Sequence, residues 1–404
     1  MYYELIYTRC GQGIDLMKKG ESIPTEGYKV YACSPELLQD RAIDWSFLVN
    51  SAQSKQSYSD PDFMDDAYLY IVPDFGKSFF ANFHPRKFEP NQDDINTNRP
   101  GNFINQIFVG GFENIYPFEL FVNKDIWTAK TKNEAYYYKS QTSGLPVHEK
   151  ITPTTEEVQR YKERIKEFIS DGRKVALASA VSFLTTQYSK EPSQRKFLVI
   201  SDKSSQNIEL WIAAIQCAFS RKLAAKIPFA TRMDNFPVAN RYTVNPAGLF
   251  QNQINYQDPN QKPRYRAMIV GVDERDKTNY ETTKSHANSQ YVLLDGIAKK
   301  PQFDTDISTE YYKMITEFGK EHNAFCEEFL PSVDIYEPNE SVVEIGNAYL
   351  QLKKAAKEDN TTKMIESLIV LSRYNIGNSI DLKQNEKGME TSKSFLGKIT
   401  KWVK

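Results

Sequence analysis

A regular alternation of apolar segments constrains the fold of this chain more than any other feature of its sequence. Four segments have strand length and are almost continuously apolar: 196–202, 226–232, 266–273 and 290–296. A helix-length segment with an apolar stripe, 208–224, lies between the first two. Apolar strands that alternate with helices are typical of a parallel sheet covered by helices. We therefore predict an α/β middle domain with a mostly parallel sheet over residues 152–300.

The residues before this domain have a different pattern. Short β-branched and aromatic runs of strand length recur at 3–8, 27–34, 67–72 and 103–110. Ser34-Pro35 is a helix-start signal, because serine caps a helix and proline suits its first turn. Strands that are not interleaved with long helices favour an α+β arrangement. We predict an α+β N-terminal domain over residues 1–131.

Helical signals mark the start of the middle domain and the end of the chain. Thr154 and Glu157 form a T-x-x-E capping box, which predicts a helix beginning at that point. Apolar residues at three-and-four spacing predict three further helices over 308–330, 340–357 and 361–374. We predict a helical C-terminal region over residues 301–404.

Charge and hydropathy exclude several classes of protein. The chain has 404 residues, and its 51 Lys and Arg against 52 Asp and Glu give a net charge of −1. Nucleic-acid binders usually carry a basic excess, so we expect no nucleic-acid partner. The longest apolar segments have about ten residues, whereas a membrane-spanning helix needs about twenty. Because the N-terminal residues also lack the pattern of a signal peptide, we predict a cytoplasmic protein without a transmembrane segment.

No motif in the sequence specifies a reaction. Gly76-Lys77-Ser78 imitates the end of a phosphate-binding loop, but Ile71 stands where that loop needs a glycine. The four histidines form no HExxH, and no GxSxG motif supplies a nucleophile. His322 and Cys326 would share one face of a helix, yet two ligands do not make a metal site. We therefore expect no catalytic residues and no resident cofactor. The four cysteines form no CxxC pair, and we expect them to be reduced: Cys10, Cys33, Cys217 and Cys326.

The ends of the predicted strands carry the best candidate site. Asp202, Asp273 and Asp295 each end a strand, and Thr231 and Arg232 end another. Ligands of open parallel sheets bind at the carboxyl ends of the strands, so these groups could converge there. Clustered carboxylates could then hold a cation such as Mg²⁺. The alternative is structural, because aspartate often caps a loop or the helix that follows a strand.

The end of the chain forms a basic amphipathic segment. Phe395, Ile399 and Trp402 would lie on one face of a helix, with lysines around them. This pattern suits a membrane surface or the groove of a partner protein. The alternative is a helix that packs on its own bundle.

Several motifs resemble the bacterial GTPase-associated protein 1 family. In the middle domain these are Asp202, Trp211-Ile212-Ala213-Ala214 and Pro228-Phe229-Ala230-Thr231, followed by strands at 264–273 and 291–296. In the N-terminal part, the segments that resemble the type 2 N-terminal domain of the family are 3–13, 31–35, 101–111 and 116–127. The resemblance covers residues 3–296, which is nearly three quarters of the chain.

The resemblance implies a function but brings no catalytic residues. Members of this family look like companions of GTPases in bacterial NTP-dependent conflict systems, where they join the GTPase to effector proteins. Where many relatives carry a histidine in a GNxxxH-like element, this chain has Gln106, which argues against an acid–base role at that position. We predict an adaptor or regulatory protein that is not an enzyme and acts by protein–protein interaction. The alternative is a nucleotide- or Mg²⁺-binding enzyme module that uses Asp202, Asp273 and Asp295.

Overall fold

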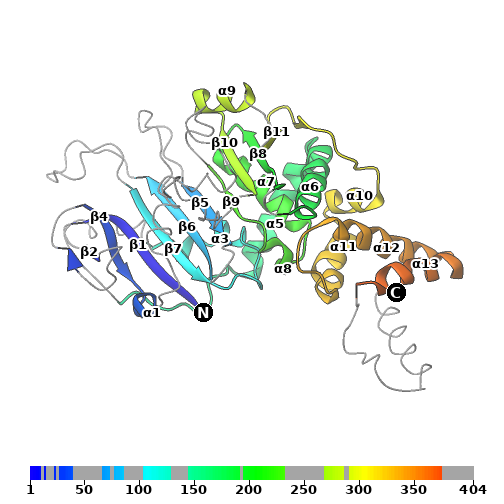
Figure 1. The fold of residues 1–404 in the computed structure, drawn as a ribbon, viewed down its shortest axis with the longest axis horizontal. Coiled ribbons are helices and arrows are strands. Elements are labelled where there is room, and N and C mark those ends of the chain that lie inside the picture. The colour runs from blue at the N-terminus through cyan, green and yellow to red at the C-terminus, as the bar shows by residue number, and fades with distance from the viewer. Residues whose placement is uncertain are drawn as a thin grey trace, which may run out of the picture.

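One mixed sheet of twelve strands forms the frame of the molecule. The computed structural model describes residues 1–10, 13–14, 22–23, 27–39, 66–72, 77–85, 103–128, 144–191, 194–232, 268–285 and 291–374. The strand order in the sheet is β12-β11-β8-β10-β9-β5-β6-β7-β1-β4-β2-β3. Helices pack beside the half of the sheet that comes from the middle of the chain (Figure 1). The chain is therefore a mixed α/β protein, as its sequence predicts.

The N-terminal half of the sheet is antiparallel. Its strands are β1 (Tyr2–Cys10), β2 (Gly13–Ile14), β3 (Ser22–Ile23), β4 (Gly27–Cys33), β5 (Ala67–Ile71), β6 (Ser78–Pro85) and β7 (Phe103–Gly110). Short helical segments accompany them: α1 (Pro35–Gln39), α3 (Glu119–Val122) and η1 (Lys124–Ile126). In β5, Tyr68 and Tyr70 enter one apolar cluster, whereas Leu69 and Ile71 enter another on the opposite face. Both faces of this strand are buried, which explains its continuous apolar run.

Four strands from the middle of the chain pair in parallel. β8 (Phe197–Asp202) lies between β10 (Ile269–Asp273) and β11 (Tyr291–Asp295), and β9 (Phe229–Ala230) follows on the far side of β10. The short β12 (Lys300–Pro301) pairs with β11 in the antiparallel sense. On its other side, β9 pairs antiparallel with β5 and so joins the two halves of the sheet.

The predicted mostly parallel sheet of the middle domain is not confirmed. The three parallel pairings belong to a larger sheet that is mostly antiparallel. The expected strand over 226–232 is reduced to the two residues of β9, whose outer edge is taken by β5. An apolar pattern shows that a strand is buried on both faces, but it does not identify the strand that hydrogen-bonds to its edge.

Helices cover both faces of the parallel strands. On one face lie α5 (Thr155–Ser170), α6 (Lys174–Tyr188), α7 (Ser205–Cys217) and α8 (Arg221–Ala224), which share an apolar cluster with alternate residues of the strands. On the other face, Tyr280 of α9 (Lys277–Ser285) packs with Phe197 and Val199 of β8. The capping box of α5 is present as predicted, with Thr154 and Glu157 bonded reciprocally.

The C-terminal helices pack into the same core. They are α10 (Glu310–Glu317), α11 (Lys320–Asn323), the π-helical segment η5 (Ala324–Phe329), the short η6 (Leu330–Ser332), α12 (Glu340–Lys357) and α13 (Thr361–Ser372). Tyr311, Phe325 and Tyr349 join the cluster that α5, α6 and α7 share. The sheet and this cluster together contain residues from all three predicted ranges, 1–131, 152–300 and 301–404. The division of the chain into three domains at these boundaries stays a prediction.

Two further expectations from the sequence concern the cysteines and membrane-spanning helices. All four cysteines are buried and carry free thiols. Among the described residues, no helix combines the length and the apolar character that crossing a membrane requires.

Gly271, in the middle of β10, lies where no side chain fits. A Cβ atom there would be 2.0 Å from the carbonyl oxygen of Thr231 and 2.5 Å from Cγ2 of Ile208. Gly271→Ala should lower the free energy of unfolding by about 3 kcal/mol, because β10 must move away from β9 and α7. The control is Gly319→Ala, which meets no atom within 4 Å and should cost at most about 1 kcal/mol. Urea denaturation measures both, and equal stabilities would contradict this account of β10.

Candidate functional site

The predicted acidic residues lie at one edge of the parallel strands but on two faces of the sheet. Asp202 and Asp273 are directly opposite each other on neighbouring strands. Asp295 lies opposite Ser201, one position before Asp202. Because side chains alternate along a strand, Asp295 projects to the α9 side while the other two project to the α7 side. The structure therefore brings Asp202 and Asp273 to one face and places Asp295 on the other.

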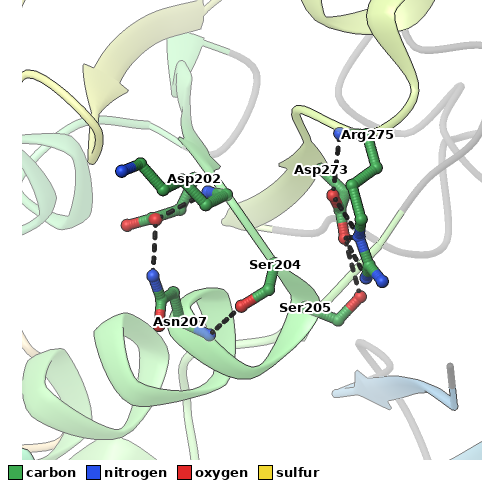
Figure 2. Close-up of polar contacts among 7 residues, drawn as sticks. Asp202, Ser204, Ser205, Asn207, Asp273 and Arg275 are labelled. Atoms are coloured by element: carbon green, nitrogen blue, oxygen red, sulfur yellow. Dashed lines mark hydrogen bonds and ion pairs between the residues drawn. The ribbon is translucent and has the colours of Figure 1, made fainter.

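The carboxylate of Asp202 is held by groups of the following turn and helix. Asp202 is buried, and its Oδ1 accepts hydrogen bonds from the backbone N–H of Lys203 at 2.6 Å and from Nδ2 of Asn207 at 2.7 Å (Figure 2). Its Oδ2 accepts a hydrogen bond from the indole N–H of Trp211 at 2.9 Å. A Cβ at Gly296 would lie 2.4 Å from this Oδ2, so only glycine lets the end of β11 approach. Asp202 thus fixes α7 and the end of β11 to the end of β8.

Asp273 makes a second and separate set of bonds. Its carboxylate accepts hydrogen bonds from Nη2 of Arg275 at 2.6 Å and from Nε of the same side chain at 3.0 Å. The hydroxyl of Ser205 donates to it at 3.1 Å (Figure 2). Ser204, the residue before, caps α7 by accepting a bond from the backbone N–H of Asn207 at 3.2 Å. The first turn of α7 therefore lies between the two carboxylates and bonds to both.

The remaining predicted residues serve other contacts. Asp295 Oδ1 accepts a bond from the backbone N–H of Ala298 at 2.9 Å, and its Oδ2 lies 3.7 Å from Nζ of Lys284 on α9. Thr231 Oγ1 accepts a bond from the backbone N–H of Tyr68 at 2.8 Å, which ties the end of β9 to β5. Arg232 follows it and is buried.

These bonds define what the strand-end carboxylates can do. Each carboxylate already accepts hydrogen bonds from protein groups that position the start of a turn or helix, as capping aspartates do. Among the described residues, no group of three or more His, Cys, Asp or Glu is arranged to hold a metal ion. A cation at this edge would have to replace the bonds from Trp211, Asn207 or Arg275. The geometry supports the structural alternative of the sequence analysis for Asp202, Asp273 and Asp295.

A buried acid near the N-terminus is a feature that sequence reasoning missed. Glu4 Oε1 accepts a hydrogen bond from Nε2 of Gln106 at 2.7 Å, and Glu4 Oε2 lies 2.9 Å from Nε2 of His148. Glu4 is 3 % exposed, so these two side chains take the place of water around its carboxyl group. The histidine beside this acid comes from position 148, not from position 106. No local pattern could reveal a pair that is 144 residues apart in the sequence.

A pocket of about 190 Å³ lies where the C-terminal helices meet α5 and α7. Its buried lining, which we call the floor, consists of Tyr116, Cys217, His322 and Cys326. The exposed lining, which we call the mouth, consists of Gln159, Glu163, Lys166, Asn323 and Glu327, and the half-buried Lys162 and Phe318 lie between the two. His322 and Cys326, which the sequence predicts on one helical face, both belong to the floor. Their common cavity could not be predicted from that spacing.

Burial keeps the floor of this pocket uncharged. Burial lowers the pKa of His322 to about 4, and nearby Lys162 acts in the same direction. The neutral ring donates from Nε2 to the carbonyl oxygen of Cys217 at 2.8 Å, because a carbonyl can only accept. Burial also raises the pKa of Cys217 to about 12 and that of Cys326 well above its usual value. Protonated thiols are poor nucleophiles, so the floor suits binding rather than covalent catalysis.

The predicted contact residues at the chain end, Phe395, Ile399 and Trp402, lie outside the described residues. Comparison with known proteins adds no assignment to the site: no protein-family model matches the sequence, and no curated protein matches it.

Asp202→Ala should lower the free energy of unfolding by about 3 kcal/mol, because it leaves the indole N–H of the fully buried Trp211 without an acceptor. In a Trp211→Phe background, which lacks this donor, the same substitution should cost at least about 1 kcal/mol less. The control Asp171→Ala removes an exposed carboxylate and should leave stability close to wild type. Urea denaturation of wild type, the two single variants and the double variant measures the coupling between Asp202 and Trp211. Additive losses of stability would show that their hydrogen bond contributes nothing.

The neutral His322 should make stability depend on pH. Its pKa is lower in the folded protein than in the unfolded chain, so the unfolded chain binds the extra proton between about pH 6.5 and pH 4. The stability it contributes is present above this window and is lost as the pH falls, by about 3 kcal/mol. Because the glutamine of His322→Gln cannot titrate, the free energy of unfolding of this variant should fall by about 3 kcal/mol less than that of wild type between pH 7 and pH 4. Parallel losses in urea denaturation at the two pH values would contradict a buried neutral imidazole.

Proposed function

We propose that this protein is a cytoplasmic adaptor or regulator that binds a GTPase in a bacterial NTP-dependent conflict system and joins it to effector proteins. The resemblance of residues 3–296 to the GTPase-associated protein 1 family supports the choice of partner. The observation that carries the proposal is an exposed apolar surface on α13, formed by Ile365 and Ile369 and bordered by the half-buried Met364 and Leu368, which pack against the core; we call it the α13 surface.

The α13 surface is unusually exposed for its composition. Ile365 is 52 % exposed and Ile369, one turn later, is 54 % exposed. Of the twelve residues of α13, only Ser367 and Leu371 are buried. Large apolar side chains that cluster at the surface mark sites of protein–protein contact. A helix that buries one side on α12 and exposes aliphatic residues on another is suited to receive a partner.

Polar groups surround the α13 surface as they surround a binding interface. Lys363 and Glu366 are exposed on the same helix. Beyond its end, Arg373 forms an ion pair with Glu344 of α12 at 3.3 Å. An apolar centre with a polar rim is the usual anatomy of a non-obligate protein interface.

The alternative function, a nucleotide- or Mg²⁺-binding enzyme module, would use Asp202, Asp273 and Asp295. The hydrogen bonds that these carboxylates accept from Trp211, Arg275 and backbone groups give them a structural role. No specific observation favours this alternative over the adaptor.

The adaptor proposal predicts a nucleotide-dependent partner that binds the α13 surface. Immobilised protein should retain a GTPase from lysate of its own host with either GDP or a non-hydrolysable GTP analogue, identified by mass spectrometry. Ile365→Glu/Ile369→Glu should lower the amount of this GTPase at least about tenfold, because apolar anchors carry most of the energy of an interface. Lys320→Glu, at an exposed position of α11 outside the α13 surface and its polar rim, makes the same change of two charge units and should leave binding within about twofold of wild type.

Two results would contradict this proposal, the first its partner and the second its binding site. One is the absence of any enriched GTPase in both nucleotide states. The other is a purified GTPase that binds wild type and the double glutamate variant equally well, with circular dichroism showing that both are folded. The second result would leave the GTPase as a partner but remove the α13 surface as its site.

A further inference from the structure

The pocket around His322 contains a buried hydrogen-bond acceptor that is left without a partner among the described residues. The ring of His322 is 3 % exposed and lines the pocket. Its Nε2–H donates to the carbonyl oxygen of Cys217, whereas its buried Nδ1 has no hydrogen-bond partner in the described part of the chain. A buried acceptor without a donor is costly, so it is rare unless a ligand or water completes it.

The backbone around the pocket is unusual on two sides. Phe318 has a φ of 49°, which bulky residues rarely adopt, and its ring contacts the His322 ring with centroids 5.0 Å apart. Cys326 and Glu327 belong to the π-helical segment η5. π-Helical turns are rare in proteins, and those that occur are often found at functional sites. Backbone conformations of this cost persist where a site requires them. Both features place side chains in the lining of the same pocket.

The charges at the pocket do not select an ion. Lys162 forms an ion pair with Glu327 across the pocket lining, and Lys166 and Glu163 add one charge of each sign. The side chain of Lys162 also lies over the Tyr116 ring, with 5.4 Å from Nζ to the ring centroid. The floor is neutral, because burial keeps both thiols protonated and the imidazole unprotonated. A neutral ligand matches this balance best.

The size and chemistry of the lining restrict the ligand further. The pocket volume of about 190 Å³ is below the roughly 300–1,000 Å³ of pockets for drug-sized molecules. Two aromatic rings, Tyr116 and Phe318, and two sulfur atoms, of Cys217 and Cys326, line it. Aromatic groups make favourable contacts with rings and with sulfur. A flat aromatic group of one or two rings is therefore the occupant that this lining favours.

We propose that this pocket binds a small neutral aromatic group that carries an N–H donor, and that the N–H donates to Nδ1 of His322. Indole has this chemistry, whether as a free molecule or as the side chain of a tryptophan in a peptide. The proposal goes beyond the adaptor function and uses none of the residues of the α13 surface.

The test compares indole with indene, which has the same shape but no N–H donor. Ligand-observed NMR on the full chain should give a dissociation constant for indole that is at least about tenfold lower than that for indene. N-acetyltryptophanamide distinguishes the two sources: if it binds as well as indole, the pocket accepts a peptide side chain, and if indole alone binds, it accepts a free molecule. Equal binding of indole and indene, or binding of neither, would overturn the proposal.

Two pocket variants and one control outside the pocket test whether the preference for indole arises there. His322→Phe keeps an aromatic ring in the pocket but has no nitrogen that can accept a hydrogen bond, so the preference for indole over indene should fall to about one. His148→Phe makes the same change outside the pocket and should keep the preference. Phe318→Gly removes an aromatic wall at a position whose φ of 49° suits glycine, and it should weaken indole binding several-fold while keeping the preference. An unchanged preference in His322→Phe, or unchanged affinity in Phe318→Gly, would overturn the assignment.

Discussion

The pairing of β5 with β9 is the contact on which the rest of the architecture depends. It is short: Leu69 lies opposite Ala230 and Tyr70 opposite Phe229. Thr231 extends it by donating its backbone N–H to the carbonyl of Tyr68 at 2.9 Å and accepting the N–H of Tyr68 at its hydroxyl. Without these bonds the antiparallel and the parallel strands would form two sheets with two exposed edges, which proteins avoid.

Side chains strengthen this joint where the backbone pairing is short. The hydroxyl of Tyr70 donates to the carbonyl of Ala225 at 2.7 Å, and that of Tyr116 donates to the carbonyl of Phe219 at 3.1 Å. The centroid of the Phe229 ring lies within 6 Å of the ring centroids of Tyr70, Phe80 and Phe121. Aromatic residues dominate the joint because each buries a large apolar area and the tyrosines also satisfy a buried carbonyl. The high aromatic content of the chain, 13 %, therefore has a specific structural use.

Elements of the middle domain were predictable because local patterns determine them. The apolar runs of β8, β10 and β11 fall inside the predicted strands, and the capping box of Thr154 marks the start of α5. The helix expected over 208–224 is divided into α7 and α8, which no apolar stripe indicates. The register of the strands was not predictable either. Asp295 lies one position out of line with Asp202, and this single step puts its carboxylate on the other face of the sheet.

Long-range pairs were beyond any reading of one sequence. Glu4 with His148, and Tyr68 with Thr231, are pairs that form only when distant segments meet. Sequence patterns report the burial and the period of a segment, whereas the identity of a partner depends on the tertiary arrangement. This is why the strand ends could be found as candidates but the pocket around His322 could not.

The helical region shows where this protein departs from the most stable local geometry. In α10 and α11, a left-handed Phe318 and the π-helical turn that follows interrupt what would otherwise be one continuous helix over the predicted range 308–330. An uninterrupted helix would keep all its backbone bonds in regular geometry and would lack these costs. It would also carry His322 and Cys326 on a different line along the core. The interruption lies where an imidazole, two thiols and two aromatic rings meet at one cavity, and Tyr311 of α10 and Phe325 of η5, whose ring centroids are 5.9 Å apart, connect the segments before and after it within the apolar core.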